Sequence, residues 1–210
     1  MAIHDFPWFS TLRRWQDEGM PTDLSPAEYF GYEMVRIQPD TSPRFPQEVV
    51  EETEEYVIHT TAFGGLRRDH KDYSTTPEIV DYPCKTREDW ERIKERLTPS
   101  RDRVEWEGEL LDDASYDTSV RRSSLPKGTW NVRLSRYART GLEGCRKARE
   151  DGNFVCFWGA VGYDKMQSYV ATESLLIAVA TQPDWVRDMY ETDAELHMKM
   201  YEIMREGGFE

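Results

Sequence analysis

The part of the sequence most suited to chemistry is the loop segment that runs from Trp158 to Asp164. The segment overlaps the end of an apolar run that begins at residue 153 and is typical of a strand. Loops that follow parallel strands form the active sites of α/β barrels. Small residues such as Gly159 would let a ligand approach the backbone, and Tyr163, Asp164 and the later Tyr169 could supply hydroxyl and carboxylate groups. The alternative is that the glycines form a turn and the tyrosines cap the core. The candidate substrate-binding residues here are Trp158, Gly159, Tyr163 and Asp164.

A second candidate site is basic and lies at residues 67–71, directly after the pair Gly64-Gly65. Arginine binds carboxylates through two parallel hydrogen bonds, so Arg67 and Arg68 are candidate substrate-binding residues. The alternative is a solvated hairpin tip whose arginines form local ion pairs, which contribute little to stability.

Metal and cofactor motifs are missing from the sequence. The three cysteines, Cys84, Cys145 and Cys156, are far apart and form no C-x-x-C pair, and no two histidines have zinc-ligand spacing. His197 falls on an apolar stripe of a long predicted helix and is interpreted as a satisfied core histidine. No dinucleotide fingerprint or P-loop is present. The sequence therefore predicts neither a metal site nor a cofactor.

The elements that would position these residues change in character at about residue 130. Beyond it the pattern predicts a helix over 131–150, a strand over 153–160, a helix over 173–180 and a long helix over 183–206. The apolar content of the strand favours burial on both faces, as in a parallel sheet. Because one such strand cannot close a sheet and a (β/α)8 barrel needs about 250 residues, we expect part of a larger barrel, truncated at its C-terminus. The alternative is a small complete α+β protein.

The preceding residues predict short elements. Residues 7–18 read as a helix, residues 33–84 as small antiparallel hairpins, and residues 86–97 as a helix opened by a capping box at Thr86. We therefore expect one domain over 1–210, with N-terminal helices and hairpins in 1–130 and the first βα units of the barrel in 131–210. The predicted fold class is α/β, as the N-terminal portion of a (β/α)8 TIM barrel.

Composition excludes several classes of protein. The 210 residues include 27 Lys and Arg against 40 Asp and Glu, a formal charge of −13, which would repel nucleic-acid phosphates. No apolar run approaches the roughly 20 residues that span a bilayer, and no signal peptide is visible. Aromatic residues make up 12%, which is typical of a folded chain. We expect a cytoplasmic protein that binds a small molecule and neither nucleic acid nor membrane.

Several motifs, in this order and spacing, resemble the uroporphyrinogen decarboxylase family and its divergent decarboxylase-like branch. They are Arg14-Trp15-x-x-Glu18-Gly19-Met20-Pro21, Glu28-Tyr29-Phe30-Gly31-Tyr32, Pro77-x-Ile79-x-x-x-Pro83, Asp89-Trp90-Glu91-x-Ile93-Lys94, Phe157-Trp158-Gly159-Ala160 and Pro183-Asp184-x-Val186. The resemblance spans nearly the whole chain but only the first part of the family's domain. It implies a (β/α)8 barrel preceded by helices and hairpins.

The resemblance also implies a reaction. Members of the family decarboxylate a tetrapyrrole in haem biosynthesis without a cofactor, using an aspartate, arginines and a loop tyrosine. Asp40 lies at about the offset of the family aspartate and Tyr169 is the counterpart of the tyrosine, so both are the expected catalytic residues. The sequence around Asp40 differs from the family signature, and the family's N-terminal arginine segment has no match here.

Two other functions stay open at this point. Relatives with the same fold are corrinoid-dependent methyltransferases, whose zinc ligands lie in the second half of the barrel, so zinc and a corrinoid are the cofactors of that alternative. The other alternative is an inactive fragment or interaction module that associates through an exposed sheet edge, either as a homodimer or with the remaining part of the barrel.

Overall fold

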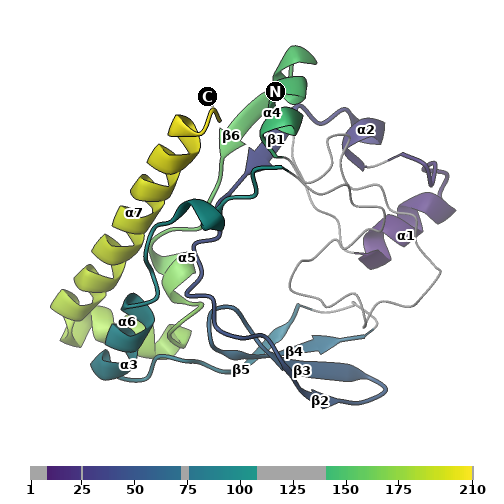
Figure 1. Ribbon diagram of the computed structural model, residues 1–210. Helices are drawn as coiled ribbons and strands as arrows, with labels where there is room; N and C mark the ends of the chain where they lie inside the picture. Colours follow the sequence, from purple (N-terminus) through teal and green to yellow (C-terminus); the bar gives the residue numbers. More distant parts are fainter. Residues whose placement is uncertain (1–8, 25, 72–75, 108–140, 210) are drawn as a thin grey trace.

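The fold is mixed α/β, with helices around two small sheets. The computed structural model describes residues 9–24, 26–71, 76–107 and 141–209. Strands β1 (Met34–Ile37) and β6 (Phe154–Phe157) form a parallel pair, and four other strands form an antiparallel sheet. The two sheets lie at opposite ends of the molecule, with helix α7 along one side (Figure 1). Within the described ranges there is no closed barrel and no helix long and apolar enough to cross a membrane.

The parallel pair corrects the predicted hairpins. Residues Met34–Ile37 were expected in an antiparallel hairpin within 33–84, but Met34 pairs in parallel with Phe154, and Ile37 pairs with Phe157. The backbone N–H of Trp158 extends this ladder by donating to the Ile37 carbonyl oxygen at 2.8 Å. The parallel sheet therefore begins at β1, well before residue 131.

Strand β6 is also more exposed than its apolar sequence predicts. Phe154 is 62% exposed and Phe157 is 37% exposed, so burial on both faces is wrong for this strand in the described structure. The reason is that β6 pairs only with β1 among the described residues. Helix α4 (Leu142–Glu150) precedes the strand, and the rest of the predicted helix over 131–150 lies outside the described residues.

The antiparallel sheet contains the hairpin that the glycine pair predicts. Its strands lie in the order β2 (Val49–Glu52), β3 (Tyr56–Thr60), β4 (Leu66–His70) and β5 (Glu78–Asp81). Between β3 and β4, Gly64 has φ +92°, and a Cβ atom there would lie 2.7 Å from the Phe45 ring. A side chain at this position would therefore be strained as well as crowded.

The helices largely follow the sequence pattern. They are α1 (Phe9–Asp17), α2 (Pro26–Phe30), α3 (Arg87–Lys94), the short 3-10 helix η1 (Arg101–Arg103), α5 (Tyr163–Met166), α6 (Thr172–Thr181) and α7 (Pro183–Glu206). Thr86 and Asp89 form the predicted capping box of α3. Trp90, Tyr169 and Met189 are among the large side chains that the main core buries completely.

Candidate functional site

The C-terminal ends of β1 and β6 lie at one edge of the parallel pair, because the two strands run in the same direction. The segment that follows β1 carries Asp40, and the segment that follows β6 carries Gly159 and leads into α5. Figure 1 shows α5 between the parallel pair and the antiparallel sheet, beside α7. Ligands bind at this kind of edge in open α/β sheets. We therefore expect the polar groups of a binding site to converge at this edge.

Asp40 presents an ionised carboxylate at this edge. Its Oδ1 accepts hydrogen bonds from the Ser42 backbone N–H at 2.9 Å and the Ser42 hydroxyl at 2.6 Å, and its Oδ2 accepts from Arg44 Nε at 2.6 Å. Partial burial alone would raise the pKa of Asp40, but the bonds from Ser42 and Arg44 outweigh it and hold the pKa below the usual value. The side chain is 41% exposed, so the negative charge is accessible.

Arg103 fixes the segment that carries Asp40. Its side chain is buried, and it donates to four backbone carbonyl oxygens, those of Asp40 at 3.0 Å, Ser42 at 2.7 Å, Thr98 at 2.7 Å and Arg96 at 2.7 Å. The Asp40 backbone N–H in turn donates to the Arg103 carbonyl oxygen at 2.7 Å. This role was not predicted from the sequence, where Arg103 lies in a charged, turn-rich stretch.

Lys165 on α5 is a buried basic residue at the same edge of the parallel pair. It is 4% exposed, and its Nζ donates to the Thr41 hydroxyl at 2.6 Å and to the Thr41 carbonyl oxygen at 3.2 Å. Nζ also lies 4.0 Å from Asp193 Oδ1. Burial lowers the pKa of Lys165, although the charges of Asp193 and Asp40 oppose this shift. Lys165 directly follows Asp164, the last residue of the loop segment predicted from the sequence.

Asp193 and His197 face this cation from α7. Asp193 is completely buried and His197 is 3% exposed. His197 Nδ1 donates to the Asp193 carbonyl oxygen at 2.9 Å and lies 3.5 Å from Asp193 Oδ1. Neither carboxylate oxygen of Asp193 nor His197 Nε2 has a hydrogen-bond partner in the described part of the chain. The interpretation of His197 as a satisfied core histidine is therefore wrong at Nε2.

Tyr169 contributes a neutral phenol to the cluster. It is completely buried, with its ring centroid 5.5 Å from that of Phe63 and 5.9 Å from that of Trp90. Its hydroxyl has no hydrogen-bond partner among the residues that the structure describes. Burial raises the pKa of Tyr169, and the charges of Asp193 and Asp40 raise it further. Asp40 and Tyr169, far apart in sequence, thus lie in one electrostatic cluster.

The loop after β6 closes over part of this cluster. A Cβ atom at Gly159 would lie 2.8 Å from His197 Nε2 and 3.1 Å from the Tyr201 hydroxyl, so glycine allows a close approach of backbone to α7. Trp158 is 44% exposed, Tyr163 packs half-buried against the core, and Asp164 is exposed.

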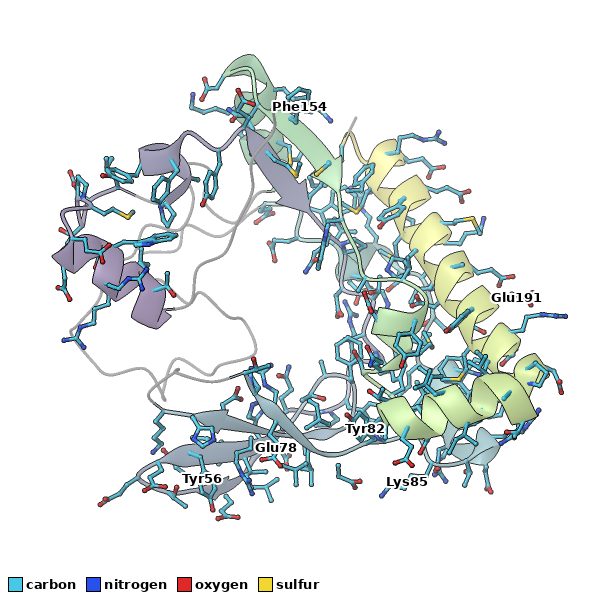
Figure 2. The ribbon with its side chains drawn as sticks, turned by 180° about the vertical axis from the view of Figure 1, so that it is seen from behind. Tyr56, Glu78, Tyr82, Lys85, Phe154 and Glu191 are labelled. Atoms are coloured by element: carbon cyan, nitrogen blue, oxygen red, sulfur yellow. The ribbon has the colours of Figure 1, made fainter. Side chains whose placement is uncertain are left out.

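Arg67 and Arg68 belong to a different set of contacts. Both lie on β4, where Arg67 Nη2 is 2.6 Å from Asp69 Oδ1 and Arg68 Nη1 is 2.7 Å from Glu78 Oε2. Figure 2 shows Glu78 on the antiparallel sheet, at the other end of the molecule from Phe154 of β6. These contacts are local ion pairs. A role of the two arginines in substrate binding stays a prediction.

The described ranges contain no group of three or more His, Cys, Asp or Glu side chains that could hold a metal ion. Burial raises the pKa of Cys84 to about 12 and that of Cys145 to about 11, which keeps both thiols protonated at neutral pH. Comparisons of the chain with protein-family models, with curated proteins and with solved structures find no match.

Proposed function

We propose that this chain is part of a (β/α)8 enzyme that decarboxylates a tetrapyrrole or a related carboxylated substrate, as uroporphyrinogen decarboxylases do. One observation carries the proposal. The segments after the parallel strands β1 and β6 meet where Lys165 Nζ donates to Thr41, the residue after Asp40, and both Lys165 and Tyr169 contact the Phe63 ring. Enzymes of this kind place their sites at this edge. The reaction itself follows from the motif resemblance, and β1 and β6 would be two strands of the barrel.

The charges of the cluster suit this chemistry. Loss of CO2 leaves an electron pair on carbon, and a protonated pyrrole ring can accept that pair. An ionised Asp40 would stabilise the cationic ring, because a fixed charge costs no reorganisation during the reaction. Lys165 would attract the substrate carboxylates, and the neutral Tyr169 hydroxyl would donate a hydrogen bond to one of them.

The test measures CO2 released from uroporphyrinogen, kept anaerobic, by the full chain and by the variant Asp40→Asn. We expect the rate to fall roughly 100-fold in the variant, because the neutral amide cannot stabilise a cationic ring. Asp81→Asn is a matched control, since Asp81 pairs with Lys85 four residues later just as Asp40 pairs with Arg44. A full rate in Asp40→Asn, or an equal loss in both variants, would contradict the proposal.

A second candidate function is association with a second copy of the chain. The observation that favours it is exposed apolar surface on α6, where Leu176 is 56%, Ile177 55% and Val179 48% exposed. We expect a concentration-dependent dimer in sedimentation experiments, and Leu176→Asp should make the chain monomeric. Val50→Asp, at a residue 60% exposed on the antiparallel sheet, should leave the dimer intact. A monomer at every concentration contradicts this function.

A further inference from the structure

The proposed active site contains an acid–base pair for which the proposed function has so far assigned no role. Asp193 and His197 lie one turn apart on α7, both buried, with the Nδ1 atom of the imidazole directed at Asp193. Because Nδ1 faces a carbonyl oxygen, it must carry a hydrogen, and a neutral ring then has its lone pair on Nε2. Nε2 is the ring atom without a partner in the described structure.

The pair has the arrangement that general acid–base chemistry requires. The Asp193 carbonyl oxygen 2.9 Å from Nδ1 and the carboxylate 3.5 Å from it fix the orientation of the ring. Gain or loss of a proton then takes place at Nε2. This nitrogen lies next to Gly159 in the loop after β6, where a Cβ atom would come within 2.8 Å of it. The neighbouring loop residues Trp158, Ala160 and Val161 are exposed, so only this loop separates Nε2 from the site edge on that side.

We propose that His197 is the proton donor of this site and that Asp193 is its positioning residue. The inference rests on the proposed function and deepens it. When the bond between the substrate carbon and its carboxyl group breaks, CO2 leaves and the electron pair passes into the protonated pyrrole. The pair then returns to the carbon as a C–H bond whose proton comes from Nε2, and the pyrrole releases to water the proton that it took up before CO2 left. The neutral imidazole regains a proton from water.

The charges around the imidazole come from several elements and affect its protonation together. Asp193 and Tyr201 lie on the same helix, Lys165 approaches from α5, and Asp40 and Arg103 act on Lys165 from the segment after β1 and from η1. Asp193 Oδ1 lies 3.5 Å from His197 Nδ1 and 4.0 Å from Lys165 Nζ, so one carboxylate faces both groups.

The first experiment tests the pair without substrate. In the full chain with 15N-labelled histidine, NMR should show that the neutral His197 ring carries its hydrogen on Nδ1. In Asp193→Asn we expect the 15N resonances of the His197 ring to move, because the carboxylate 3.5 Å from Nδ1 is replaced by a neutral amide. Glu191→Gln, at an exposed residue on the outer side of α7 (Figure 2), should leave these resonances unchanged. A hydrogen on Nε2 in the neutral ring, or unmoved resonances in Asp193→Asn, would overturn the pairing.

The second experiment measures the pH dependence of decarboxylation. A proton donor must be protonated, so the rate of the natural chain should fall as pH rises through the His197 titration. In His197→Gln we expect a rate roughly 100-fold lower and no such fall, whereas His70→Gln should behave like the natural chain. An unchanged profile in His197→Gln overturns the inference alone. If the natural chain releases no CO2 from uroporphyrinogen, the proposed function is wrong. The NMR experiment still tests the pairing of Asp193 with His197 in that case.

Discussion

The hydroxyl of Tyr169 is a polar group that folding buries without a hydrogen bond in the described structure. A buried unpaired group costs free energy, so its retention favours a role in binding or catalysis over one in stability. Asp193 and His197 also bury side-chain atoms that have no partner in the described structure, whereas the buried Nζ of Lys165 is bonded to Thr41. None of these three was singled out as a site residue from its sequence context, so their place at this edge is recognisable only once the chain is folded.

This view predicts opposite effects of Tyr169→Phe on stability and activity. The free energy of unfolding, measured by urea denaturation, should stay unchanged or rise by up to about 1 kcal/mol, because no hydrogen bond is lost. Decarboxylation should fall, because the phenol donor is gone. Tyr190→Phe on α7 is the control and should retain activity. A Tyr169→Phe protein that loses more than about 2 kcal/mol would show that the hydroxyl is hydrogen-bonded after all.

Short elements at this edge depend on a long-range clamp more than on their own propensity. The segment after β1 has only a four-residue strand before it, and Arg103 supplies the bonds that hold it. Arg103→Met should lower the free energy of unfolding by about 3 kcal/mol, because it leaves buried carbonyl oxygens without donors. It should also lower activity through a displaced Asp40.

The matched control for this clamp is Arg101→Met in the same 3-10 helix. Arg101 is exposed and stacks on the Trp106 ring at 3.8 Å, so its loss should cost about 1 kcal/mol or less. Equal effects of the two substitutions in urea denaturation would contradict the role assigned to Arg103.

Elements with local signals were the ones that sequence patterns predicted. The capping box at Thr86 and the proline at the start of α7 lie within a few residues of the helix ends that they specify. The pairing of β1 with β6 has no local signal, because it joins strands far apart in sequence. Because this pairing was not predicted, Met34–Ile37 was expected in an antiparallel hairpin and not in the parallel pair. The same pairing brings Asp40 to Lys165, so Lys165 could not be predicted as part of the site, whereas Asp40 and Tyr169 were expected from the motif resemblance.

The molecule as a whole carries a charge of −13, yet many of its aspartates are individually stabilised. In Asp69, burial alone would raise the pKa, but hydrogen bonds from His59 and Arg67 outweigh burial and lower it. The pKa values of Asp40 and Asp188 are lowered too. A carboxyl group with a lowered folded pKa stabilises the fold above its unfolded pKa, and this contribution is lost as pH falls through the folded value.

We therefore predict that stability decreases as pH falls from about 5 to about 2. Urea denaturation across this range should give a shallower decrease for Asp69→Asn, which is already less stable at neutral pH because the ion pairs of Asp69 with His59 and Arg67 are lost. Asp17→Asn, at an exposed residue, should retain the natural slope. A natural chain whose stability rises on acidification would contradict the prediction.

The proposed function requires that the C-terminal edge of β1 and β6 bind the substrate. Hydrogen–deuterium exchange of the full chain, with and without saturating uroporphyrin, measures this binding at the level of backbone amides. We expect slower exchange at residues 40–44 and 158–170, with residues 49–70 of the antiparallel sheet unaffected. Protection confined to the antiparallel sheet, or none at either place, would contradict it.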